Sequence, residues 1–377
     1  MKAGSTAIAA VVTVITVVLV SAGSLFTSSG ASTHAYQRHH NWTLRAAKTV
    51  TTTATVTATA TVTATKVLSG PTATLTVPGR TATVTMPTVT STATPRPTAT
   101  ATAPVRAQMP YVGAAVRGNG DPSTLETGAG RVLGLSRTYW NYSKIGASIT
   151  RATADAKAGR VPWLSYKLSV SWADAAAGKA DAATRDLAAK LATVPGPVWV
   201  AIHHEPEGDG NLADWVATQK RLLPLLAAAP NVRTSIILTA WDTFDSGNAA
   251  YSLNALWPGN MVDIMGFDVY NRYGDANHPT SGWTEMKQWY DKIAPAAKAR
   301  GVDWAIAETG YTDAAATKDP NWLTRAYDDM ANRTDLPGVG LSYFNSTANS
   351  IGSWPLTGIK VTVFDAILNR SHQALAR

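Results

Sequence analysis

From Tyr111 to the C-terminus, short apolar runs alternate with longer segments whose apolar residues recur at helical spacing. The runs are rich in Val, Ile, Trp and Tyr, which is typical of strands buried on both faces. We predict eight strands, at residues 111–116, 131–139, 161–167, 198–203, 234–239, 262–269, 304–307 and 338–344. We predict helices between and after them, at residues 181–193, 212–228, 283–300, 322–333 and 361–376.

Strands that alternate with helices indicate an α/β fold with a parallel sheet covered on both faces. Residues 111–377 have about the length of one (β/α)8 TIM barrel, roughly 250 residues, so we predict that fold. The alternative is a doubly wound open sheet, which usually carries a Gly-rich phosphate loop between its first strand and a helix. The stretch Arg117–Gly120 resembles such a loop only superficially, because a strand-like region soon follows it.

The first thirty residues differ from the rest of the chain. Lys2 is followed by an apolar, uncharged stretch and then by small residues at 21–24, the pattern of a secretory signal with its cleavage site. The uncharged stretch from Thr6 to Phe26 is also close to the roughly 20 residues that span a bilayer, so a retained anchor is the alternative. We assign residues 1–30 to a signal peptide or signal anchor and expect a protein that is secreted or held at the cell surface.

A tract rich in Thr, Ala, Val and Pro follows the signal segment. It has almost no large side chains, so it cannot bury enough apolar area to offset the entropy lost on ordering. We predict that residues 31–110 form a disordered linker, or stalk, and that residues 111–377 form the catalytic domain.

The net charge of +8 belongs to the N-terminal segment, because residues 1–110 contain eight Lys or Arg and no Asp or Glu. These basic residues are thinly spread, so we expect no nucleic-acid partner. The chain has no cysteine, which excludes disulfides and thiolate chemistry.

Two of the predicted strands deliver a glutamate at their carboxyl end. The fourth runs through Trp199 to His203-His204-Glu205, and the seventh leads to Glu308. In a (β/α)8 barrel the carboxyl ends of all strands open on one face, where catalytic residues lie. Two carboxyl groups that face each other across one mouth are what glycoside hydrolysis requires. We therefore predict Glu205 and Glu308 as the catalytic pair.

The adjacent histidines suggest a metal site at first. Adjacent strand residues point to opposite faces, and the spacing is not that of a His-Glu-x-x-His motif, so His203 and His204 cannot easily share one ion. We predict no metal and no other cofactor, with one histidine directed into the barrel and His203 as the bystander. Metal-dependent hydrolysis through both histidines and Glu207 is the least favoured alternative.

The two segments His204–Pro206 and Ala307–Thr309 resemble the retaining glycoside hydrolases of clan A. Most members of that clan have Asn before the acid/base, whereas glycoside hydrolase family 26, the β-mannanases and their relatives, has His, as this chain has at His204. The resemblance covers residues 111–377 and implies a (β/α)8 barrel. It also implies that Glu205 is the acid/base and Glu308 the nucleophile.

The same resemblance implies a hydroxyl from the sixth strand that helps hold the nucleophile, and Tyr270 is the candidate. Where the family would place a platform Trp after the eighth strand, this chain has Tyr343-Phe344-Asn345. Sugars offer apolar ring faces to aromatic residues and hydroxyls to charged ones. The candidate substrate-binding residues are His204, Tyr270, Trp241, Arg137, Trp140, Asp268 and Tyr343.

Two of these assignments have structural alternatives. Asp268 and Arg137 would instead be scaffold if they formed a buried ion pair. An aromatic residue within a strand, such as Trp163, is more often core than platform.

The sequence thus predicts a secreted or surface-tethered retaining β-glycosidase, resembling endo-β-mannanases, that acts on a mannan-like polysaccharide by double displacement. The alternative is a non-catalytic carbohydrate-binding barrel carried on a cell-wall stalk. We expect a monomer whose partner is a polysaccharide or oligosaccharide. The N-terminal segment would tether it to a membrane or cell wall.

Overall fold

The computed structural model describes residues 72–77, 80–85, 109–275, 278–347 and 353–372. The predicted signal segment and most of the predicted linker lie outside the described residues, so both stay predictions. Within the linker, β1 (Thr72–Val77) and β2 (Arg80–Thr85) pair as an antiparallel hairpin, where the sequence predicts no regular structure. β-Branched residues favour strands, and the Pro-Gly dipeptide between these two strands is a common turn signal.

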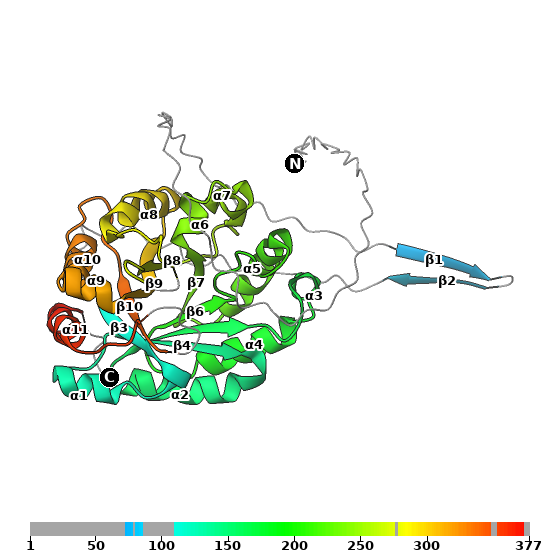
Figure 1. Cartoon of the computed structure of the whole chain (residues 1–377). Coiled ribbons are helices and arrows are strands. Elements are labelled where there is room, and N and C mark those ends of the chain that lie inside the picture. The colour runs from blue at the N-terminus through cyan, green and yellow to red at the C-terminus, as the bar shows by residue number, and fades with distance from the viewer. Residues whose placement is uncertain (1–71, 78–79, 86–108, 276–277, 348–352, 373–377) are drawn as a thin grey trace, which may run out of the picture. The chain divides into compact units, whose positions relative to one another are not determined.

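Eight parallel strands close into a barrel in the order β10-β3-β4-β5-β6-β7-β8-β9 (Figure 1). The first four are β3 (Tyr111–Val116), β4 (Leu135–Asn141), β5 (Val161–Lys167) and β6 (Val198–Ile202). The others are β7 (Val232–Thr239), β8 (Ile264–Asn271), β9 (Asp303–Tyr311) and β10 (Gly340–Asn345). Every predicted strand is present, and the predicted (β/α)8 barrel is confirmed. The open-sheet alternative is wrong, because Gly340 of β10 pairs with Tyr111 of β3 and closes the ring.

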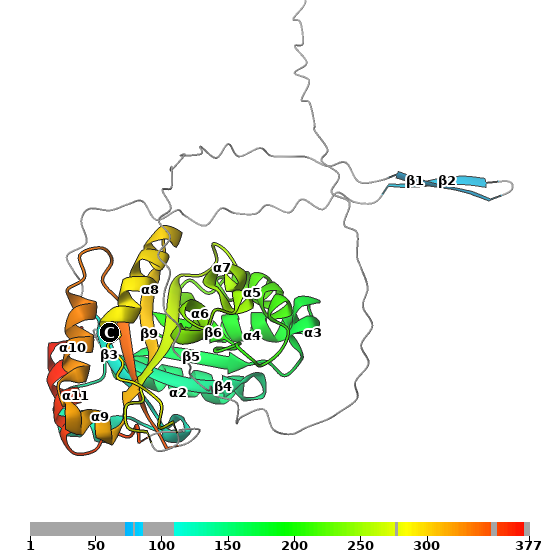
Figure 2. The same ribbon diagram turned by 45° about the horizontal axis from the view of Figure 1, so that its top comes forward.

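Helices surround the barrel. The longer ones are α2 (Ile145–Lys157), α4 (Asp181–Leu191), α5 (Leu212–Leu226), α8 (Met286–Arg300), α10 (Trp322–Ala331) and α11 (Ile359–Arg370). Short helices are α1 (Ser123–Ala129), α3 (Trp172–Ala176), α6 (Ala240–Phe244), α7 (Leu253–Leu256) and α9 (Asp313–Lys318), with single turns η1 (Arg117–Asn119), η2 (Tyr142–Lys144) and η3 (Ala249–Tyr251). The two C-terminal helices, α10 and α11, lie side by side in both views (Figures 1 and 2).

Side-chain alternation along the strands produces two apolar layers. One layer packs between strands and helices, and the other fills the inside of the barrel, where Trp163 and Trp199 meet edge to face with ring centroids 5.2 Å apart. Along a strand the inward positions become polar toward the carboxyl end, as from Ile264 to Asp268 on β8. The apolar amino end is thus a packed core, and the polar carboxyl end is the mouth.

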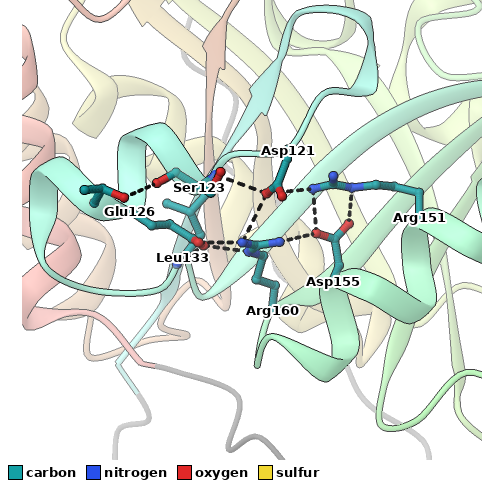
Figure 3. A network of polar contacts seen from close by, with 8 residues as sticks. Asp121, Ser123, Glu126, Leu133, Arg151, Asp155 and Arg160 are labelled. Carbon is teal, nitrogen blue, oxygen red and sulfur yellow. Dashed lines mark hydrogen bonds and ion pairs between the residues drawn. The ribbon is translucent and has the colours of Figure 1, made fainter.

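An ionic network with a buried centre lies beside the starts of β4 and β5 (Figure 3), and Asp121 is its exposed member. Arg160, the residue before β5, donates to Glu126 of α1 at 2.6 Å and to Asp155 of α2 at 2.9 Å. Asp155 accepts two further bonds from Arg151, at 2.8 and 2.9 Å, and Asp121 lies 3.4 Å from Arg160. We call these five residues the base network.

In the described part of the chain, no helix combines the length and the apolar character needed to cross a membrane.

Candidate active site

The chain turns sharply where β6 ends. His203 and Glu205 both have φ of 48°, a left-handed conformation that is uncommon for residues other than glycine. Such conformations cost about 1–3 kcal/mol each and tend to occur at functional sites. The backbone N–H of Glu205 donates to the carbonyl of Ile237 on β7 at 2.9 Å, which holds the turn in place. This turn positions Glu205 at the barrel mouth.

The two histidines of this turn point in different directions, as predicted. The Nδ1 of His203 accepts from Trp172 at 3.1 Å, so its Nε2 carries the proton and donates to Asp209 at 3.0 Å. His203 therefore braces the loop outside the barrel. The ring of His204 lies 5.4 Å from that of Tyr139, which belongs to the mouth. Burial and the nearby charge of Arg137 lower the pKa of His204 well below its ordinary value.

A β-bulge aims Glu308 into the barrel. Phe267 of β8 pairs with Ile306, but the next residue, Asp268, pairs with Glu308, so Ala307 is an extra residue in β9. The pairing of β9 with β10 shifts register at the same place. Simple alternation would turn Glu308 outward, because Ala307 belongs to the inner layer. Bulges commonly re-aim a side chain beside an active site, and this one does so for Glu308.

Two partners, one on the neighbouring strand β8 and one on β4, hold the carboxyl group of Glu308. The hydroxyl of Tyr270 donates to Oε2 at 2.8 Å, the contact that the resemblance implies. The guanidinium of Arg137 lies 3.8 Å from Oε1 and stacks over Tyr139, with its centre 4.4 Å from that ring. Among the described residues, the ion pair of Arg137 is with Glu308, so the predicted alternative of a pair with Asp268 is wrong.

The carboxyl group of Glu205 has the electrostatics of a general acid. Burial, together with the negative charge of Glu308, raises its pKa to about 8. A hydrogen bond with Asp268 and the positive charges of Arg137 and Arg272 oppose this rise without cancelling it. At neutral pH the site therefore holds a protonated carboxyl group beside Glu308.

Asp268 lies between the two glutamates. Burial raises its pKa well above the ordinary value, and the charges of Glu308 and Glu205 add to the rise. Three carboxyl groups thus lie close enough for their charges to interact, which is the arrangement that separates acid from base roles in catalytic sites. We call Arg137, Glu205, Glu207, Asp268, Arg272 and Glu308 the mouth cluster.

Two residues that we singled out lie elsewhere. The ring of Tyr343 is fully buried outside the barrel against Phe364, with ring centroids 6.0 Å apart, and its hydroxyl donates to the carbonyl of Trp354 at 2.6 Å. Trp140 donates to Thr138 at 2.8 Å and packs against the outer layer. Both predicted substrate-binding roles are corrected, because strand alternation turns these two side chains away from the mouth.

Trp163 and Trp241 lie in different parts of the barrel. Trp163 belongs to the inner core, as we expected of an aromatic residue within a strand, and its indole N–H donates to Ser235 at 3.0 Å. Trp241 is half-buried in α6, directly after β7. Its role in substrate binding stays a prediction.

Four residues in or beside the mouth were not among the predicted site residues. Tyr139 faces Glu308, whose charge adds to burial in raising the pKa of the tyrosine. Trp354 packs on Tyr270 with ring centroids 4.8 Å apart. Arg272 follows the last residue of β8 and lies two residues after Tyr270, so the period-2 pattern of the strand, continued by one residue, points to it.

Glu207 is the fourth of these residues, and we had ranked it as secondary. Its Oε1 accepts from the backbone N–H of Thr239 at 3.1 Å, and its buried Oε2 has no hydrogen-bond partner. Burial and the charge of Glu205 raise its pKa well above the ordinary value. Glu207 is therefore a further buried carboxyl group whose surroundings disfavour its charged form.

Among the described residues, no group of three His, Asp or Glu side chains could hold a metal ion. The side chains of His203 and His204 also point in different directions, so they do not converge on one ion as metal-dependent hydrolysis would need.

Models of known protein families and curated protein sequences contain no match to this chain. Solved structures do match. GH26A from Muricauda sp. is 17% identical over 65% of this chain and 87% of its own, with a TM-score of 0.43. The endo-1,4-β-D-mannanase from Thermotoga petrophila is 10% identical over 70% of this chain and 100% of its own, with a TM-score of 0.48.

A third match is the GH128 endo-β-1,3-glucanase from Amycolatopsis mediterranei, which is 12% identical over 68% of this chain and 98% of its own, with a TM-score of 0.41. At these identities the similarity concerns the barrel fold alone.

Proposed function

We propose that this protein is a retaining β-glycosidase that hydrolyses a polysaccharide by double displacement. The observation that carries the proposal is a pair of carboxyl groups at the mouth: Glu205, whose pKa burial raises to about 8, and Glu308, which Tyr270 and Arg137 hold in place. A protonated carboxyl group and a positioned carboxylate at one barrel mouth are the two groups that the reaction needs.

In the first step the Glu308 carboxylate attacks the anomeric carbon while the bond from that carbon to the leaving oxygen breaks. Glu205 gives its proton to the leaving oxygen, so a glycosyl ester on Glu308 and a free sugar hydroxyl result. In the second step Glu205, now ionised, takes a proton from water as the water oxygen attacks the anomeric carbon. The ester bond breaks, and both glutamates return to their starting states.

The geometry supports the change of role that Glu205 must undergo. The charge of Glu308 is the second largest cause of the raised pKa of Glu205. Ester formation removes that charge, so the pKa of Glu205 falls once it has donated its proton. The acid of the first step thereby becomes a competent base for the second.

The finer assignments rest on sequence features. A mannan-like substrate and endo cleavage are proposed from His204, which precedes the acid/base. An extracellular location is proposed from residues 1–30, and tethering to the wall or membrane from residues 1–110. We also propose that the protein acts on a polysaccharide as a monomer.

The test is a panel of mannan, xylan and mixed-linkage glucan assayed for new reducing ends with the full chain and with Glu205→Ala and Glu308→Ala. We expect Glu308→Ala to fall to background, and Glu205→Ala to lose about 10²–10⁴-fold. The loss in Glu205→Ala should shrink on aryl glycosides, whose leaving groups need no proton, and azide should rescue it. Arg185→Ala, which removes a charge from the exposed face of α4, is the matched control.

Proton NMR of the first product formed distinguishes retention from inversion. An inverted anomer would overturn the double-displacement mechanism. Saturable binding with no reducing ends from any polysaccharide would favour a carbohydrate-binding barrel instead.

A further inference from the structure

Arg272 continues the inward row of β8 beyond the end of the strand. Asp268 and Tyr270 face the barrel interior, and Arg272 is the next residue at the two-residue spacing. The residue is half-buried, and its Nη1 is shielded from solvent without a hydrogen-bond partner. An arginine with an unused donor therefore stands above the proposed catalytic pair.

Among the described residues, no carboxylate lies within ion-pair distance of Arg272. Burial lowers the pKa of Arg272, and the electrostatic influence of Tyr270, Asp275 and Glu205 offsets this only in part. The carboxylate of Asp275 is 2.9 Å from Nδ1 of His278, and Arg137 is paired with Glu308.

Among the described residues, no carboxyl group of the mouth forms an ion pair with this guanidinium. Burial also raises the pKa values of Glu205, Asp268 and Glu207, which disfavours the charged form of each. Glu308 remains as the partner of Arg137. A buried charge without a counterion is costly, so this corner of the mouth favours a ligand that brings a negative charge.

We propose that Arg272 binds the carboxylate of a uronate residue in the substrate, close to the bond that is cleaved. This inference rests on the proposed glycosidase function and changes its substrate class from a neutral mannan-like chain to an acidic polysaccharide. A guanidinium presents a planar pair of donors that matches a carboxylate, and the single charge of each group cancels the other.

A competing role for Arg272 lies within the enzyme itself. Its charge lowers the pKa of Glu205, so it would stabilise the ionised acid/base after proton transfer. That role would affect every substrate equally, whereas recognition of a carboxylate affects only acidic ones. The ratio of activities on matched acidic and neutral substrates therefore separates the two roles.

The experiment compares glucuronoxylan, alginate and pectate, each with a counterpart whose carboxyl groups are reduced to alcohols. The full chain and Arg272→Gln, Arg272→Lys and Arg185→Gln are assayed for kcat/KM and, by calorimetry with derived oligosaccharides, for Kd. We expect the wild type to prefer at least one acidic form about 10- to 100-fold, as charge-assisted hydrogen bonds allow. Arg272→Gln should bring that ratio close to one, Arg272→Lys should retain part of it, and Arg185→Gln should leave it unchanged.

Each other outcome is decisive. Equal handling of acidic and reduced polymers by the wild type, or binding of none of them, overturns the inference, as does an equal loss on both forms in Arg272→Gln. If the protein binds acidic chains selectively through Arg272 but cleaves none of them, the inference is supported and the glycosidase function is wrong. If it cleaves only neutral chains, the glycosidase function is supported and the inference is wrong.

Discussion

The protein has two clusters of charged residues with buried members, the base network and the mouth cluster, and neighbouring groups shift pKa values in opposite senses in the two. In the base network, two arginines and three carboxylates alternate, and Arg160 is bonded on several sides. Burial alone would lower the pKa of Arg160, but its hydrogen bonds to Glu126 and Asp155 raise it instead. Each charge there stabilises its neighbours.

In the mouth cluster, four carboxyl groups lie close together, and among the described residues only Glu308 forms an ion pair, with Arg137. Burial and mutual repulsion raise the pKa of Glu205 to about 8, and Nη1 of Arg272 has no partner. The same side-chain types thus stabilise the fold at one place and destabilise it at the other. Unfavourable electrostatics at the mouth keep a proton on an acid that would otherwise lose it, which is what the proposed reaction needs.

The largest effect that we expect comes from breaking the base network. Arg160→Met leaves Glu126 without its cation, and it leaves Asp155, which is fully buried, with Arg151 alone. Loss of one partner from a buried ionic cluster costs about 3–5 kcal/mol in the free energy of unfolding. Urea denaturation measures this loss, and the activity per folded molecule should stay at the wild-type level. A cost no larger than that of Arg185→Ala would contradict the comparison.

Glu205→Gln should have the opposite effect on stability. The folded pKa of Glu205 is about 8, above its ordinary value of 4.5, so between these two pH values the unfolded chain releases a proton that the folded chain keeps. Its contribution to stability is therefore greatest at or below pH ~4.5 and is lost as pH rises to ~8. The variant should be more stable than the wild type by roughly 2–4 kcal/mol at pH 8 and nearly equal to it at pH 4.

Denaturant titrations of both proteins at the two pH values measure this difference. Arg185→Gln serves as the control, since its exposed side chain should give the same small change at both. If Glu205→Gln is less stable than the wild type at pH 8, the carboxyl group of Glu205 does not destabilise the folded state.

The activity itself should report the same pKa. Above pH ~8 the free enzyme loses the proton of Glu205, so kcat/KM should fall about tenfold for each further pH unit. A substrate whose leaving group needs no protonation should show a weaker decline in the same buffers. An alkaline limb that begins below pH 6 would mean that Glu205 does not carry the raised pKa.

The smallest effect should come from a residue that alternation turns away from the mouth. Trp140→Phe removes one hydrogen bond to Thr138 at the outer layer, which costs about 1 kcal/mol in stability. Because the side chain does not reach the mouth, kcat/KM should change less than the roughly fivefold factor that 1 kcal/mol represents. A larger loss of activity would return Trp140 to the substrate site.

Much of the fold followed from apolar patterning. The predicted bounds of β3 and β5 match the structure, because turn residues or helices flank both runs. The predicted seventh strand stopped at residue 307, whereas β9 continues to Tyr311. A sequence of Glu, Thr and Gly has low strand propensity, and only pairing with β8 and β10 keeps it extended.

By itself, the sequence determined that eight apolar strands alternate with helices and that the fourth and seventh each deliver a glutamate. Those features depend on local composition and period. Tertiary structure alone decided that Ala307 bulges to turn Glu308 inward, that Trp354 reaches Tyr270 from a loop, and that Tyr343 points outward. It also decided the protonation of Glu205, since a pKa depends on burial and on charges that other strands bring near.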